Sequence, residues 1–272
     1  MAGGNFRYLT TSDSRGHNIK DIGNADDVLN AAPGLYPASG HNMKIIDTNL
    51  TCAGDVGCHG NRSSTFGTGI RALKGAHHQN VDGKCDTANT IANSYRFLSG
   101  VKGLENTTDK WQNKDKNSHN EYFGATSPKT FSTCSSVDCH GGNGVFSSNG
   151  SISVFCGTCH GDFHRIGGIG GDTVSPFTRH PTDISLPASG EYTAYTTYSV
   201  VAPVARTTVP DSPSSTVDPT GSTDDIVMCL SCHGAHGTNY PDILRWDYST
   251  MIAGGGGSGG CFTCHTRKSQ NP

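Results

Sequence analysis

Residues 229–246 read CLSCHGAHGTNYPDILRW, a stretch that opens with two cysteines separated by two residues and a histidine directly after the second cysteine. Two further segments have the same spacing, Cys156/Cys159/His160 and Cys261/Cys264/His265. Two wider versions separate the cysteines by four residues, in Cys134/Cys139/His140, and by five, in Cys52/Cys58/His59. With 11 cysteines and 13 histidines in 272 residues, chance gives about 0.5 Cys-His neighbours, so five of them form a motif.

Covalent haem attachment explains both the constant end of the five segments and their variable gaps. Two thioether bonds join the cysteines to the vinyl groups of one porphyrin, and the next histidine then lies under the iron as proximal ligand. A longer gap bulges outward without moving the second cysteine relative to its histidine. The segments predict five c-type haems, with these proximal ligands: His59, His140, His160, His233 and His265.

Zinc sites, disulfides and thioredoxin-like redox pairs are the alternative interpretations of these cysteines. Zinc needs two cysteine pairs, or one pair and a His-x(3–5)-His step, at a fixed separation, and the gaps here are irregular. A disulfide framework has no need of a histidine after alternate cysteines. Cys85 lies outside the five pairs, and we expect an idle thiol there, with an intermolecular bridge or a bridge to Cys52 as alternatives.

The remaining histidines predict the second axial ligands of the irons. Beyond the five proximal histidines the chain has eight, His17, His41, His77, His78, His119, His164, His180 and His236, against only four methionines. This pool favours bis-histidine ligation, which gives lower reduction potentials than methionine–histidine ligation. The candidates we favour are His17, His41, His78, His119, His180 and His236.

The composition predicts a chain with little regular structure. Only 33% of the residues are apolar and 36 are glycine, which is too few apolar side chains for an ordinary core. Porphyrins would supply the missing apolar mass. We therefore expect one elongated unit over residues 1–272, mostly coil with a few short helices and strands, wrapped around a chain of stacked haems.

Short elements are expected at particular places along this unit. Residues 86–98 have the best helical pattern, residues 224–232 and those after Pro241 predict short helices, and residues 192–204 predict a strand. An N-terminal arm, residues 1–48, carries too little apolar surface to fold alone. Residues 206–225, rich in Ser, Thr, Pro and Asp, predict an exposed loop.

Charge and hydropathy exclude other classes of partner. A net charge of −3 argues against nucleic acid, which attracts clustered Lys and Arg. No run approaches the roughly 18 apolar residues of a membrane span. Haem is attached outside the cytoplasm, and no secretory signal follows Met1, so we expect an exported protein whose signal has been removed.

With the motifs in place, the chain resembles a known family. The pair CSSVDCH…CGTCH, residues 134–160, and the segment 229–246 are similar to modules of exported cytochromes of metal-reducing bacteria. The Gly-His-Asn segments at His17 and His41, with residues 94–98, resemble filament-forming extracellular cytochromes of the OmcE and OmcS type. A departure from the OmcE type is the count, since that type is described with four haems.

The resemblance implies a head-to-tail homopolymer with a continuous haem chain, in which an iron near the interface takes a histidine from the next subunit. His17, on the arm, matches that ligand best. The leading function is therefore extracellular electron transfer toward redox partner proteins and extracellular acceptors. A soluble periplasmic or secreted shuttle is the alternative. A multihaem reductase is less favoured, because it needs an open iron position and every motif here ends in histidine.

Overall fold

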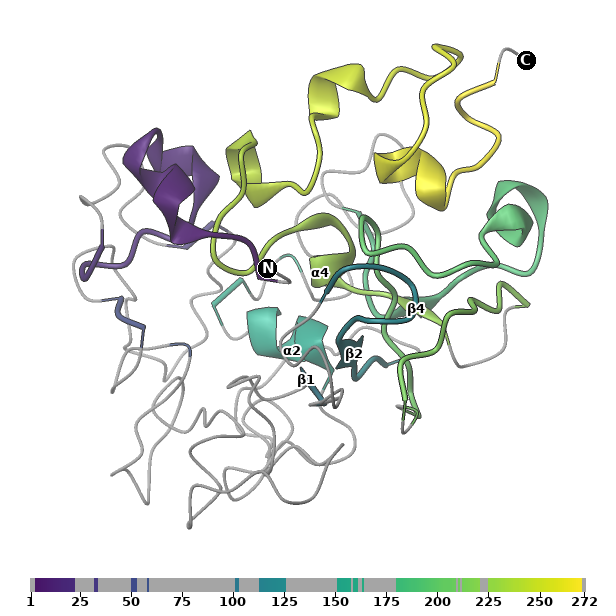
Figure 1. Ribbon diagram of the computed structural model, residues 1–272, viewed down its shortest axis with the longest axis horizontal. Coiled ribbons are helices and arrows are strands. Elements are labelled where there is room, and N and C mark those ends of the chain that lie inside the picture. Colours follow the sequence, from purple (N-terminus) through teal and green to yellow (C-terminus); the bar gives the residue numbers. More distant parts are fainter. Residues whose placement is uncertain are drawn as a thin grey trace.

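The chain folds into short elements joined by irregular segments (Figure 1). The computed structural model describes residues 3–22, 32–33, 50–52, 58, 101–102, 113–125, 151–157, 159–160, 163, 180–208, 210, 212–220 and 225–270. Its helices, with η for a 3₁₀ helix, are η1 (Phe6–Thr10), η2 (Asp13–Arg15), α2 (Ile152–Gly157), η6 (Gly190–Ala194), α4 (Cys229–Cys232), η7 (Pro241–Ile243), η8 (Tyr248–Thr250) and η9 (Gly260–Thr263). Its strands are β1 (Val101–Lys102), β2 (Glu121–Tyr122), β3 (Ile184–Ser185) and β4 (Ile226–Val227). The expected mostly coil architecture is confirmed for these residues, and none of the described helices has both the length and the apolar content of a membrane span.

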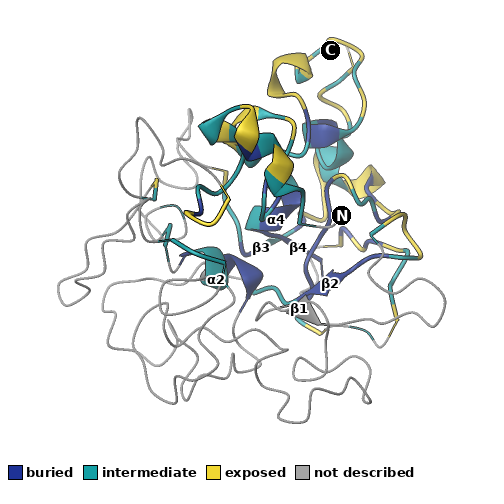
Figure 2. Ribbon diagram, turned by 60° about the vertical axis from the view of Figure 1, so that its left-hand side comes forward, coloured by how far each residue is buried: buried dark blue, intermediate teal, exposed yellow. Residues whose placement is uncertain are grey.

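Two antiparallel ladders hold the centre of the described structure. Strand β1 pairs with β2, Val101 opposite Tyr122, and β3 pairs with β4, Ile184 opposite Val227. Side chains alternate across a strand, so the two residues of β4 enter different apolar clusters. Figure 2 shows the buried ribbon gathered at β2, at α4 and at the start of α2.

The two apolar clusters are small. Ile226 belongs to the first, which consists of Tyr122, Ile152, Ala205, Ile226, Met228 and Leu230. Val227 belongs to the second, which consists of Leu186, Tyr195, Tyr198, Val204, Val217 and Val227, with the partly buried Cys264 packed against it. The first cluster joins α2 to α4, the helices that carry two of the cysteine motifs.

A buried ion cluster connects these ladders to the loop between residues 206 and 225. The Arg206 guanidinium donates to Glu121 at 3.1 Å, to Asp225 at 2.6 Å and to the carbonyl of Thr216 at 2.8 Å. Burial raises the pKa of the Asp225 carboxyl, while the nearby Arg206 charge acts in the opposite direction. The loop is exposed at Thr216 and Asp218, but Arg206, Val217 and Asp225 anchor it in the interior.

The N-terminal arm packs on residues 236–238 of the same chain, where the purple N-terminal ribbon meets the yellow-green segment in Figure 1. Backbone hydrogen bonds run from His236 to Gly3, at 2.6 Å, and from Asn5 to Gly237, at 2.7 Å. A Cβ at Gly4, whose φ is 82°, would lie 2.0 Å from the Gly237 carbonyl oxygen. This close approach requires glycine at Gly4.

Local expectations agree with the structure to different degrees. The strand expected over residues 192–204 is wrong, because the chain begins there with η6 and then folds back on itself. The Tyr195 hydroxyl donates to the carbonyl of Ala202 at 2.6 Å and accepts from the amide of Ser199 at 3.2 Å, which holds the segment in a compact loop. The helix expected over residues 86–98 lies outside the described residues.

Two further expectations were right about position and wrong about extent. Residues 224–232 were expected to form one short helix, but β4 occupies part of the range and α4 covers only the motif itself. The helix after Pro241 is η7, which ends at Ile243, before Trp246. A positive φ of 56° at Asp242 stops its continuation, because the left-handed region does not propagate a helix.

Replacement of Arg206 by methionine tests the ion cluster. Glu121 and Asp225 would remain buried without their cation, so we expect the free energy of unfolding to fall by about 3–5 kcal/mol. Denaturant unfolding followed by far-ultraviolet circular dichroism measures the change. The exposed Arg267→Met is the control, with an expected change within about 0.5 kcal/mol. Equal stabilities of the two variants would contradict a structural role for the cluster.

Candidate haem attachment sites

The three Cys-x-x-Cys-His motifs form the same backbone turn. In each, the histidine amide donates to the carbonyl of the first cysteine: His160 to Cys156 at 3.0 Å, His233 to Cys229 at 3.1 Å and His265 to Cys261 at 3.0 Å. This is one i to i−4 helical turn, in which residues three and four apart lie on one side. The turn therefore presents both sulfurs and the imidazole to the same side of the chain.

Neighbouring motifs place their cysteines close together. The side chains of Cys156 and Cys229 hydrogen-bond to each other, and this contact together with burial raises the pKa of the Cys156 thiol. Burial, aided by nearby Cys58, raises the pKa of Cys159 to about 12. Burial, aided by nearby Cys264, likewise raises the pKa of Cys232 to about 12. Among the described cysteines, the first motif is thus near the third, the third near the fourth and the fourth near the fifth, and we call this succession of neighbours the spatial row.

Two motif histidines each face a second histidine. The ring centroids of His17 and His160 are 6.0 Å apart, and those of His180 and His265 are 6.1 Å apart. An imidazole–metal bond is about 2 Å long, so two imidazoles on opposite sides of one metal have ring centroids about 6 Å apart. The described structure therefore brings two of the expected distal ligands, His17 and His180, to the spacing of axial ligand pairs.

Hydrogen bonds at Nδ1 fix the orientation of these rings. His17 donates from Nδ1 to the carbonyl of Ala235 at 2.8 Å, His160 to that of Pro33 at 2.7 Å and His180 to that of Pro181 at 2.9 Å. His265 donates from Nδ1 to the Glu191 carboxylate at 3.0 Å. A proton on Nδ1 leaves the lone pair on Nε2, which is the form that binds a metal.

Burial keeps these imidazoles neutral. It lowers the pKa of His160 to about 4, with the nearby His17 adding to the effect, and it also lowers the pKa values of His17 and His180. A neutral imidazole is the ligand form. Burial and tautomer therefore both favour ligation at His17, His160 and His180.

The fourth motif has the same type of proximal histidine. His233 donates from Nδ1 to the carbonyl of Asp242 at 2.8 Å, and burial lowers its pKa. His236, the candidate distal ligand three residues later, stacks on Phe6 with ring centroids 4.7 Å apart. Gly3 is required beside this ring, because a Cβ there would lie 3.1 Å from Nδ1 of His236.

His119 has a different environment from the other candidates. Its Nε2 lies 2.9 Å from the Glu121 carboxylate and its Nδ1 lies 3.3 Å from the carbonyl of Asp115. A carboxylate accepts but does not donate, so the Nε2 contact requires a proton on that nitrogen. The ring is buried and stacks on Tyr198 with centroids 3.6 Å apart. This geometry makes His119 part of the ion cluster around Arg206.

The sequence did not identify the groups that orient the histidines. Four of the acceptors are backbone carbonyls, at Pro33, Pro181, Ala235 and Asp242, which no sequence pattern marks as acceptors. The fifth ring donates to a side chain, the Glu191 carboxylate. The sequence marks Glu191 only as one acidic residue in a chain with few charged residues. Predicted site residues outside the described part of the chain are His59, Cys134, Cys139, His140, His41 and His78.

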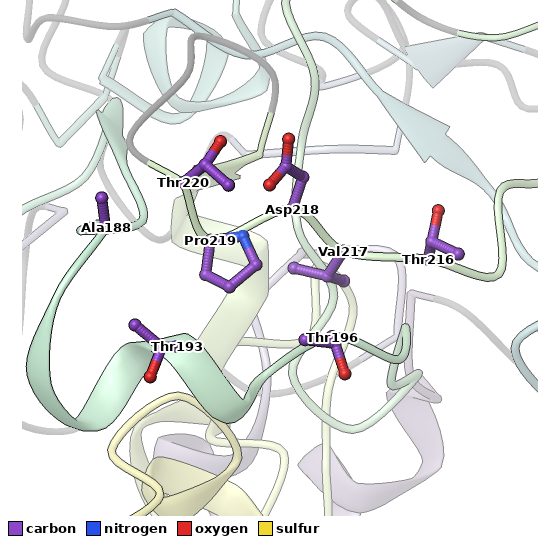
Figure 3. Close-up of a pocket in the computed structure, with 8 residues that line it drawn as sticks. All are labelled: Ala188, Thr193, Thr196, Thr216, Val217, Asp218, Pro219 and Thr220. Atoms are coloured by element: carbon purple, nitrogen blue, oxygen red, sulfur yellow. The ribbon is translucent and has the colours of Figure 1, made fainter.

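One surface hollow of the described structure lies apart from the motifs, between η6 and residues 216–220, with Thr193, Thr196, Thr216 and Asp218 among the residues around it (Figure 3). Its lining contains no cysteine or histidine. Within the described residues, no three histidine, cysteine or carboxylate side chains converge to hold a metal ion by themselves.

The residues present fit c-type haem. Each described Cys-x-x-Cys-His turn provides two sulfurs and one imidazole whose Nδ1 is already hydrogen-bonded. For two of these imidazoles, the distance between its ring centroid and that of a second histidine is close to the distance expected for two imidazoles bound to one metal. The motifs indicate covalent c-type haem binding. The third haem would be held by Cys156, Cys159, His160 and His17. The fifth haem would be held by Cys261, Cys264, His265 and His180.

Comparisons with known proteins agree with the motif at the C-terminal end. Residues 222–270 match the family model for the doubled CXXCH motif, so this segment is a doubled CXXCH module. The outer membrane cytochrome S filament from Geobacter sulfurreducens is similar, with 20% identity over 87% of this chain and 60% of that chain and a TM-score of 0.40. The OmcS nanowires from Geobacter sulfurreducens show 18% identity over 100% of this chain and 73% of that chain, with a TM-score of 0.44. No curated protein matches this chain.

Replacement of Glu191 by glutamine tests the orientation of His265. A carboxylate on Nδ1 increases the basicity of the ligating imidazole and stabilises the ferric state, so we expect one haem to become easier to reduce. The shift should be tens of millivolts upward, since about 59 mV corresponds to a tenfold change for one electron. A spectroelectrochemical titration measures it. Asp247→Asn, an exposed carboxylate bonded to Ser249, is the control, and a downward or absent shift in the Glu191 variant contradicts the assignment.

Proposed function

We propose that this chain is a pentahaem c-type cytochrome that transfers electrons outside the cell and is not an enzyme. The five Cys-x(n)-Cys-His segments give five attachment sites, each with its own proximal histidine. The spatial row of the described cysteines supports a series of neighbouring haems, the arrangement that electron transfer along a protein requires.

The observation that carries the proposal is the spacing of the facing histidines. The ring centroids of His17 and His160, and those of His180 and His265, lie at the separation of two axial ligands, and each of the four rings has its Nδ1 bonded to an acceptor of the chain. Two protein ligands leave an iron no position for substrate, which favours electron transfer over catalysis at these two centres. We propose His41, His78 and His236 for the remaining irons and leave His119 out of the ligand set.

The residues of the chain perform three tasks in this function. The cysteine turns fix the position of each group, the Nδ1 hydrogen bonds orient the axial imidazoles, and the buried surroundings exclude water. The bound iron supplies a one-electron couple, and bis-imidazole ligation holds its potential in the lower range.

We further propose that the chain polymerises into a filament outside the cell, on the sequence resemblance described above. The subunits would associate head to tail with a continuous haem chain, passing electrons from redox partner proteins to extracellular acceptors. The position of His17 beside His160 supports ligation within one chain. The proposed filament therefore differs from the one that the resemblance implies, because every iron takes both axial ligands from its own chain.

Mass spectrometry under denaturing conditions tests the haem number. Five covalent haems should add five haem masses to the polypeptide, because thioether bonds survive denaturation. Peptide mapping should then locate the haems at the ten motif cysteines. A mass corresponding to four haems would remove the segment with the longest gap, Cys52/Cys58/His59, from the proposal.

Replacement of His17 by alanine tests the distal ligand. We expect the haem mass to stay the same while one iron becomes high-spin, because the cysteines remain and one axial imidazole is lost. Absorption and electron paramagnetic resonance spectra of the purified protein measure the change. His119→Gln is the matched control, since that ring is bonded to Glu121, and its spectrum should remain low-spin. High-spin iron in the His119 variant alone would reverse the assignment.

The same variants separate ligation within a chain from ligation between chains. In the proposed arrangement, wild-type protein diluted to monomers keeps all irons low-spin, and negative-stain microscopy of concentrated protein shows filaments for both wild type and His17→Ala. Ligation in trans predicts the opposite: dilution makes one wild-type iron high-spin, and the His17 variant forms short filaments or none. Wild-type protein that stays monomeric at high concentration would support a soluble shuttle.

A further inference from the structure

The amide of Cys229 is bonded by a side chain from another motif helix. Cys229 is the first residue of α4, and the first amides of a helix have no partner within the helix. The hydroxyl of Ser153, in α2, accepts from this amide at 3.2 Å. Ser153 is fully buried, so the bond is made out of water. One attachment helix therefore caps the other.

The cysteines of the two helices also meet at this point. Ser153 precedes Cys156 by three residues, so both lie on one side of α2. The side chains of Cys156 and Cys229 hydrogen-bond to each other, and the Cys229 sulfur lies 4.0 Å from the Thr182 hydroxyl. The third and fourth motifs thus approach each other through the cysteines that begin them.

Apolar packing holds the two helices together around the polar contact. Ile152, beside Ser153, is fully buried in one cluster with Met228 and Leu230, which flank Cys229. A cluster of this kind is non-directional and permits small rotations of one helix against the other. The bond from Cys229 to Ser153 is directional and fixes that rotation.

We propose that Ser153 is a positioning residue that fixes how the haems of the third and fourth motifs meet, through its bond to the amide of Cys229. This inference rests on the proposed attachment of haem at both motifs. The step concerned transfers one electron: one iron is oxidised from Fe(II) to Fe(III) and its neighbour is reduced from Fe(III) to Fe(II), with no bond made or broken. Such exchange slows steeply with the distance between the two groups, so the fixed orientation of the two attachment helices would set its rate.

Ser153→Ala removes the acceptor and leaves every cysteine and histidine in place. We expect unchanged haem mass and low-spin absorption, but a smaller split signal in the Soret circular dichroism, which arises from coupling between neighbouring haems. Electron paramagnetic resonance should show loss of magnetic interaction between one haem pair. Ser153→Thr keeps the hydroxyl and should restore both signals toward wild type.

Ser151→Ala is the matched control for simple loss of a buried hydroxyl. Ser151 is also buried beside α2, but its hydroxyl donates to the Asp183 carboxylate at 2.7 Å. Its removal should reduce stability and leave the split Soret signal unchanged. Equal loss of the signal in both alanine variants would make Ser153 a stability residue only and would overturn the proposal.

Ser153→Val covers the case in which Ser153→Ala does not mature. Valine has the shape of the threonine in Ser153→Thr but lacks the hydroxyl that accepts from the Cys229 amide, so we expect the split Soret signal to be smaller than in the threonine variant. Equal signals in the valine and threonine variants would then overturn the proposal. Absence of haem from either motif in the wild-type protein would contradict the proposed function. A Ser153→Ala protein that carries all its haems and shows the wild-type Soret signal would contradict only the positioning role of Ser153.

Discussion

In each described Cys-x-x-Cys-His motif, the histidine amide donates to the carbonyl of the first cysteine, four residues earlier in the chain. The placement of the two sulfurs, of the imidazole and of the groups that bind the imidazole depends on this turn. A single turn of helix is marginal in isolation, because nucleation fixes several residues for one hydrogen bond. In this chain α2 and α4 stabilise each other through the cluster around Ile152 and Leu230. The remaining segments supply the carbonyls and the carboxylate that accept from the imidazoles. Irregular backbone is useful for this purpose, because it can bring a carbonyl to a ring where a helix or strand cannot.

The balance of forces differs from that of an ordinary domain of this length. The two apolar clusters are small, and a buried guanidinium with two carboxylates lies between the strands and the loop after residue 206. Buried ion pairs of this kind contribute little net stability but strongly disfavour other arrangements, since a displaced partner leaves a bare charge inside. Arg206 therefore specifies how the strand β2 and the loop meet, while packing against porphyrin would provide the bulk of the apolar contact that the side chains lack.

The sequence predicted the place of the three Cys-x-x-Cys-His turns better than it predicted the rest of the local structure. Cysteine spacing encodes the chemistry directly, so the turns at Cys156, Cys229 and Cys261 occur where the motif requires them. Distal histidines were predictable as a pool but not as pairs, because His17 and His160 are brought together only by the folded chain. His119 shows the limit of residue counting: its Gly-His-Asn-like neighbourhood resembles that of His17, yet Glu121 two residues later binds its ring. The tyrosine-rich stretch from residue 192 has strand composition, but the hydroxyl of Tyr195 bonds to nearby backbone and bends the chain.

The docking of the arm on residues 235–238 has a consequence for the order of biogenesis. His17 donates to the carbonyl of Ala235, a contact that spans 218 residues of sequence. Synthesis begins at the N-terminus, so the third motif is made well before Ala235. The His17 ring therefore lacks its acceptor, the Ala235 carbonyl, when the third motif is first exposed. Contacts of such long sequence separation close late in folding. In the proposed attachment, the cysteines at 156 and 159 would be loaded while one face of their iron is still open, and docking of the arm would require a chain made at least as far as Ala235.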